Sequence, residues 1–211
     1  FKEYCISYRV SKILAAATRA VRESPNGRDL IKRVRENIGI TIELISGAEE
    51  ARLIYLGVLS GMSLGNESHI ICDIGGGSTE LILANSKDTR ALTSSRIGAV
   101  RLKNDFFQDE PLTNSRLDFI KTFIQGSLEP SIGKIKRRLD KNESISMIAT
   151  SGTAIALGNL ISSDLGEPKQ KMHGYKFDKS NLEALLSKLI KLKPFDLRKI
   201  PSLSCLLYTS D

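Results

Sequence analysis

The stretch ICDIGGGSTEL, residues 71–81, constrains this chain more than any other feature. An apolar run ends at Asp73, three glycines follow, and an apolar alternation resumes after Ser78 and Thr79. Glycine permits positive φ and leaves its amide N–H unshielded, and consecutive amides in such a turn form an anion-binding concavity. The pattern predicts two strands joined by a tight turn, and it leaves open whether the turn binds an anion or is a ligand-free hairpin.

Two familiar glycine motifs do not describe this turn. The nucleotide P-loop ends in Gly-Lys-Ser/Thr, and the dinucleotide fingerprint has a further spaced glycine and leads into a helix. Neither feature occurs here, because the glycines are followed by Ser78, Thr79 and a strand-like alternation. A carboxylate such as Asp73 could hold Mg²⁺, and the two hydroxyls add hydrogen-bond donors beside it.

Apolar runs alternate with stretches of helical periodicity along the chain, which predicts the α/β class. Strands are expected over 11–18, 41–45, 69–74, 80–85, 90–96 and 144–150. Helices are expected over 29–37, 48–60, 154–165 and 181–192, and over 114–139 with an interruption at Pro130.

Glu49 and Glu50 lie in the first turn of the helix expected over 48–60. On a helical wheel Glu50 flanks the apolar stripe and Glu49 points to the opposite side. A carboxylate at the edge of a buried face can lie in a cleft and act as a general base toward water. The alternative is that both residues only stabilise the helix start.

Two further stretches carry groups that suit phosphate. Arg19 and Arg22 follow an expected strand end, where ligand-binding loops of α/β folds lie, and arginine binds phosphate in a bidentate manner. ATSGTA, residues 149–154, is a small-residue turn between a strand and a helix. The alternatives are ordinary surface charge for the arginines and a tight packing corner for the turn.

Composition narrows the class of partner. The 211 residues carry a formal charge of +7, which favours a polyanion such as a phosphate chain, nucleic acid or anionic lipid, or else reflects solvated faces. Aromatic residues are 6% with no Trp, so nucleic acid is the weakest of these, and no apolar run is long enough to predict a membrane span. The three cysteines are scattered and odd in number, which fits a reducing cytoplasm.

Taken in order, these stretches resemble the exopolyphosphatase/guanosine pentaphosphate phosphohydrolase (Ppx/GppA) family, within the superfamily of sugar kinases, actin and heat-shock chaperone ATPases. DIGGGSTEL indicates the superfamily; SGAEEARLIYLGV upstream, IGAVRL (97–102) and SGT indicate the family. The resemblance implies ribonuclease-H-like (actin-like ATPase) lobes with a mixed sheet flanked by helices. It also implies a remnant of the first lobe over 1–46, a second lobe over 47–205 and a non-native or disordered tail over 206–211.

The resemblance further implies release of terminal orthophosphate from inorganic polyphosphate or guanosine pentaphosphate, with Mg²⁺ as cofactor and a homodimer as an option for the complete protein. Both ends are expected to be truncated, with an N-terminal phosphate loop missing, so the fragment itself is expected to be inactive. The implied roles are a water-activating base for Glu50, metal binding for Asp73 and Glu80, and phosphate binding for Arg22, Gly75, Gly76, Gly77, Ser78, Ser151, Gly152 and Thr153. An ATP-dependent kinase of the same superfamily and a non-catalytic phosphate- or nucleotide-binding module are the alternatives.

Overall fold

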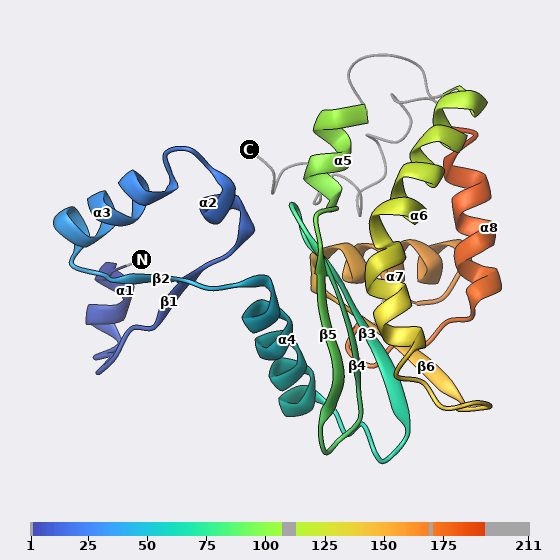
Figure 1. Ribbon diagram of the computed structural model, residues 1–211, viewed down its shortest axis with the longest axis horizontal. Helices are drawn as coiled ribbons and strands as arrows, with labels where there is room; N and C mark the ends of the chain where they lie inside the picture. The colour runs from blue at the N-terminus through green and yellow to red at the C-terminus, as the bar shows by residue number, and fades with distance from the viewer. Residues whose placement is uncertain (1, 107–112, 169–170, 193–211) are drawn as a thin grey trace.

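The computed structural model describes residues 2–106, 113–168 and 171–192 of the chain. Strands and helices alternate through these ranges and form two separate sheets, one of two strands and one of four (Figure 1). The α/β class and the mixed sheet flanked by helices are therefore confirmed. The expected tail over 206–211 lies outside the described residues.

The four-stranded sheet has the order β5-β4-β3-β6. Strand β3 (Ser68–Ile74) runs antiparallel to β4 (Thr79–Ala84), which runs antiparallel to β5 (Thr89–Ser95). Strand β6 (Ile145–Thr150) pairs in parallel with the other side of β3. Every residue of β4 is buried, because this strand lies inside the sheet and is covered on both faces.

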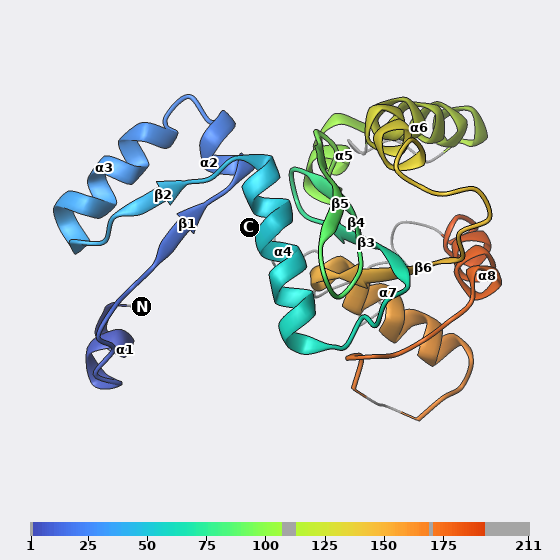
Figure 2. The same cartoon turned by 60° about the horizontal axis from the view of Figure 1, so that its bottom comes forward.

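Helices α4 (Gly47–Gly61) and α6 (Asn114–Lys136) cover opposite faces of this sheet (Figures 1 and 2). Side chains alternate along a strand, so Ile82 of β4 packs under α4 with Ala51 and Tyr55, while Leu83 packs with Ile135 of α6. Burying a large apolar side chain of this kind contributes about 1.5–3 kcal/mol relative to leaving it exposed. The two clusters hold the sheet between its helices.

The smaller sheet pairs β1 (Ala15–Ala17) in parallel with β2 (Ile42–Leu44), and it lies to one side of the larger sheet with α4 between them (Figure 2). Its apolar residues are poorly covered: Leu44 of β2 is 41% exposed, and Leu14, just before β1, is 84% exposed. The proposed division into a lobe remnant over 1–46 and a second lobe over 47–205 stays a prediction.

Within the described residues, three helices accompany the smaller sheet: α1 (Lys2–Ser7), α2 (Arg19–Glu23) and α3 (Gly27–Ile38). Helix α3 is capped by Gly39 at φ +76°.

Two sequence predictions about helices were wrong. Helix α6 runs through Pro130 without interruption, since Ile120 before the proline and Ile135 after it are both buried and this packing offsets a cost of about 3 kcal/mol. Helix α7 (Ser151–Asp164) begins three residues earlier than expected, so residues 151–153 form its first turn. Helix α8 (Lys179–Leu189) packs on α7.

Helix α5 (Ala99–Phe106) was not predicted, and its start depends on the glycine turn. The backbone N–H of Ala99 donates to the carbonyl of Gly75 at 2.9 Å, and that of Val100 donates to the carbonyl of Gly76 at 3.0 Å. These carbonyls replace the intrahelical acceptors that the first N–H groups of a helix lack. Within the described residues, no helix is both long and apolar enough to cross a bilayer.

The contact between the glycine turn and α5 predicts a large effect of Gly98→Ala. A Cβ at Gly98 would lie 2.4 Å from the carbonyl oxygen of Gly76 and 2.7 Å from that of Gly75, and backbone atoms cannot move aside cheaply. We expect the free energy of unfolding, measured in urea, to fall by about 1–3 kcal/mol. Gly57→Ala in the exposed middle of α4 meets no atom within 4 Å and should raise it by about 0.5–1 kcal/mol; equal effects would contradict the tight junction.

Candidate active site

A row of polar side chains crosses the four-stranded sheet next to the glycine turn. Asp73 of β3 is paired in register with Glu80 of β4 on one side and with Thr150 of β6 on the other, and Glu80 is paired with Ser94 of β5. Residues directly opposite in a sheet share a face. Since Ile71 and Ile82 on this face pack under α4, the whole row faces α4.

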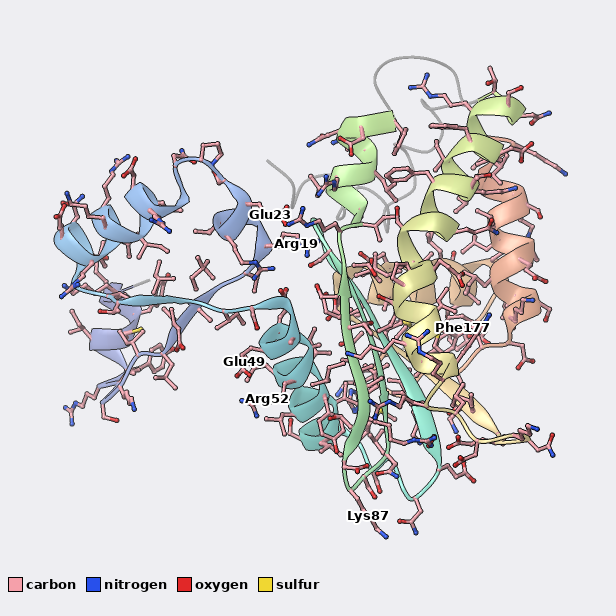
Figure 3. The ribbon with its side chains drawn as sticks, viewed as in Figure 1. Arg19, Glu23, Glu49, Arg52, Lys87 and Phe177 are labelled. Carbon is pink, nitrogen blue, oxygen red and sulfur yellow. The ribbon has the colours of Figure 1, made fainter. Side chains whose placement is uncertain are left out.

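Glu50 of α4 faces this row. Its carboxylate is half-buried, and its Oε2 atom is inaccessible to water and has no hydrogen-bond partner among the described residues. Arg22, Arg19 and Asp73 all interact electrostatically with it. Glu49 instead lies on the outer side of the helix, where both its oxygens accept hydrogen bonds from Arg52 at 2.7 and 2.8 Å (Figure 3).

The ionised forms of Glu50, Asp73 and Glu80 are all disfavoured in this site. Burial raises the pKa of Glu50, of Asp73 and of Glu80 above the ordinary carboxyl values. For Glu80, which is 1% exposed, the Ser94 hydroxyl donates at 2.7 Å and lowers the pKa, while the charge of Glu50 raises it again. The site therefore holds three mutually repelling acids that are only partly solvated.

The hydrogen bonds of the glycine turn fix the direction of its amides. Gly75 donates its own N–H to the Ser78 carbonyl at 2.9 Å, and the carbonyls of Gly75 and Gly76 point at the start of α5. In a trans peptide the N–H points away from the carbonyl. The N–H groups of Gly76 and Gly77 must then point away from α5, whereas the N–H of Gly75 is bonded to the Ser78 carbonyl.

The hydroxyl groups around the turn are mostly engaged in the fold. Thr79 donates to the Ile97 carbonyl at 2.7 Å, while Ser151 and Thr153 both donate to the Ile74 carbonyl, at 3.1 and 2.8 Å. Ser151 adopts φ +83°, a left-handed conformation that is unusual for serine. These bonds hold the N-terminus of α7, with Gly152 in its first turn, against the end of β3, so any phosphate contact from residues 151–153 would come through backbone N–H groups.

Two arginines of α2 approach the carboxylates from the smaller sheet. Arg22 donates through Nη1 to the Ile45 carbonyl, and its Nη2 reaches within 3.9 Å of where a Cβ on Gly47 would stand. Arg22 thus lies at the start of the helix that carries Glu50. Arg19 lies one turn earlier and packs against Gly77. The sequence named it with Arg22 as suited to phosphate, but the family resemblance implied a phosphate-binding role for Arg22 and not for Arg19.

The acidic row, which consists of Asp73 and Glu80, suits a divalent cation that is shared with a ligand. Among residues 2–106, 113–168 and 171–192, no three His, Cys, Asp or Glu side chains gather closely enough to form a metal site by themselves. Mg²⁺ commonly uses one or two carboxylates, with waters and substrate phosphates completing the shell. Asp73 and Glu80 lie directly opposite each other with raised pKa values, and a cation beside them would relieve their repulsion.

The fold belongs to the actin-like ATPase class. The solved structure of an exopolyphosphatase from Cytophaga hutchinsonii superposes on 96% of this chain and 64% of its own, with a TM-score of 0.84 and 25% identity. An Aquifex aeolicus member of the Ppx/GppA family superposes on 94% of this chain and 61% of its own, with a TM-score of 0.74 and 24% identity. A model of the Ppx/GppA phosphatase family matches residues 1–205, so the chain belongs to that family.

Curated relatives carry the two names of the family. A guanosine-5'-triphosphate,3'-diphosphate pyrophosphatase of Photobacterium profundum is 32% identical over 132 residues, which are 63% of this chain and 26% of the relative. Exopolyphosphatase 1 of Mycobacterium leprae is 29% identical over 160 residues, which are 76% of this chain and 46% of the relative. The chain thus spans about a quarter to a half of the length of these relatives.

The raised pKa of Glu50 predicts that Glu50→Gln stabilises the fold at neutral pH. The folded-state pKa lies above the unfolded value of about 4.3, so the ionised group costs stability above the folded pKa, and this cost fades as pH falls toward 4.3. Glu49→Gln should act oppositely, because Arg52 lowers the pKa of Glu49. Urea unfolding between pH 4 and 8 measures both, and a pH-independent difference between Glu50→Gln and wild type would contradict the assignment.

Proposed function

We propose that the full-length protein containing this chain is a phosphohydrolase that releases terminal orthophosphate from inorganic polyphosphate, guanosine pentaphosphate or both. The observation that carries this proposal is the half-buried carboxylate of Glu50, which has an oxygen without a partner and faces Asp73 beside the glycine turn. The relatives bear the names of these two activities. The chain spans only part of their length, so the activity is assigned to the full-length protein.

The residues of the site divide the chemistry among them. The amides of Gly76 and Gly77, the Ser78 position and Arg22 would bind the terminal phosphoryl group and orient it. Glu50 would accept a proton from the attacking water, and a pKa raised by burial brings a carboxylate closer to the range where a base works at neutral pH. Catalysis of this kind rests on position and charge stabilisation.

Asp73 and Glu80 would hold Mg²⁺, whose charge when bound offsets the negative charge of the substrate and of the carboxylates. Three carboxylates face two arginines in this site, so an anionic phosphate chain would add to a negative excess if no cation were present. The overall charge of +7 favours approach of a polyanion. A cytoplasmic location and a homodimeric complete protein stay predictions.

The proposed base predicts a specific loss of turnover. In the full-length protein, Glu50→Gln should lower kcat for phosphate release from polyphosphate by about 10²–10⁴-fold and leave KM nearly unchanged, because the substrate contacts remain. Glu49→Gln, one residue away and paired with Arg52 on the outer side of the helix, should retain wild-type kcat. Phosphate release is measured with Mg²⁺ present.

Four outcomes would contradict the proposal or part of it. Unchanged hydrolysis by Glu50→Gln would remove its role as the base, and equal losses in Glu50→Gln and Glu49→Gln would point to a general effect on α4. A parallel assay with ATP and sugars tests the kinase alternative: formation of a phosphosugar, without phosphate release from polyphosphate, would replace hydrolysis as the function. Binding of polyphosphate without any release would favour a non-catalytic module.

A further inference from the structure

Arg19 is a buried arginine beside the glycine turn that the proposed mechanism does not use. It is only 9% exposed, and its Nε and Nη1 atoms are inaccessible to water and make no hydrogen bond to any described residue. Its aliphatic stem runs along Gly77: a Cβ on that glycine would stand 3.6 Å from Cδ and 3.7 Å from Cγ of Arg19. The guanidinium is therefore held next to the turn by packing (Figure 3).

The neighbouring Glu23 does not satisfy this guanidinium. Its Oε1 lies 3.5 Å from Arg19 Nε, which is within ion-pair range but forms no hydrogen bond. The same carboxylate also pairs with Arg96 at 3.1 Å and with Arg101 at 3.7 Å, so one negative charge is shared by three arginines. Burial lowers the pKa of Arg19, and the nearby Arg22 lowers it further.

Buried donors in folded proteins almost always have an acceptor, and a buried charge without one is costly. Arg19 also lies within electrostatic reach of Glu50 and Glu80, so it borders the carboxylate site as well as the turn. An acceptor that reaches the Arg19 guanidinium from the side of the turn would be an anion bound to the amides of Gly76 and Gly77.

We propose that Arg19 is a second phosphate-binding arginine, whose unpartnered N–H groups donate to phosphate oxygens held at the glycine turn. Arg22 and Arg19, one turn apart on α2, then approach the same anion from the smaller sheet, while the glycine amides bind it from the larger one. This inference rests on the proposed function, because it adds a binding residue to the same site. The competing explanation is that Arg19 only pairs with Glu23 within α2 and so helps to hold that carboxylate toward Arg96 and Arg101.

The test compares Arg19→Gln with variants of its ion-pair partners in the full-length protein. Orthophosphate binding is measured by calorimetry with Mg²⁺ present, and KM and kcat are measured for polyphosphate. If Arg19 binds phosphate, Arg19→Gln should weaken orthophosphate binding and raise KM by about 10–100-fold, with a smaller change in kcat. Arg19→Lys should recover only part of this loss, because a single ammonium cannot reproduce the guanidinium donors.

Glu23→Gln and Arg96→Gln are the matched controls. The side chain of Arg96 is 74% exposed and shares Glu23 with Arg19. Its substitution therefore removes one positive charge and one arginine partner of Glu23, as Arg19→Gln does, but leaves the buried donors of Arg19 in place. Glu23→Gln and Arg96→Gln should keep KM within about twofold of wild type, since phosphate affinity depends on Arg19 itself. If Arg19 serves only as the ion-pair partner of Glu23, Arg19→Gln and Glu23→Gln should instead lose phosphate affinity equally.

The outcomes separate this inference from the proposed function. If Arg22→Gln weakens binding and Arg19→Gln does not, the inference fails and the proposed function stands. If the wild type binds orthophosphate but releases none from polyphosphate, the function fails while the affinity ratio still decides the role of Arg19. If the wild type binds no orthophosphate, the inference and the proposed function both fail. If thermal unfolding shows that Arg19→Gln does not fold, the orthophosphate affinity of Arg19→Lys relative to wild type decides. An unchanged affinity in Arg19→Lys would then overturn the inference.

Discussion

The arrangement of this site depends on the contact between the glycine turn and the start of α5. Backbone N–H groups of Ala99 and Val100 bind the carbonyls of Gly75 and Gly76, and the absence of a side chain at Gly98 allows this approach. One set of hydrogen bonds thus has two effects: it caps a helix and it turns the free amides toward the opposite side. The recognition surface of the turn is a consequence of how its other side is packed.

The acidic row and the two arginines show how binding chemistry is set against stability. Asp73 and Glu80 are neighbours in a well-packed sheet, where apolar residues would cost less, and burial raises the pKa of both. The apolar clusters on both faces, which include Ile82 and Leu83 at full burial, supply the stability that tolerates this cost. Polar groups that oppose the fold in this way are common at functional sites.

The sequence predicted most strands and helices of the described residues because apolar periodicity and glycine positions are local signals. It also predicted that Glu49 and Glu50 point to different sides of α4. It missed α5, whose start is fixed by carbonyls more than twenty positions earlier in the chain, and it placed an interruption at Pro130 where burial of the same helix on both sides prevails. The burial of Arg19 depends on contacts between two separate sheets, so no local pattern could reveal it.

The sharing of Glu23 among three arginines has a consequence for the way the two sheets are joined. Arg96 and Arg101 are well exposed; Arg96 directly follows β5 of the larger sheet and Arg101 lies in α5, while Glu23 belongs to α2. Exposed ion pairs are weak and are screened by dissolved salt, whereas the backbone hydrogen bonds of the turn are not. A rise in ionic strength should therefore loosen α2, which carries Arg19 and Arg22, before it disturbs the amides of the glycine turn that these arginines approach.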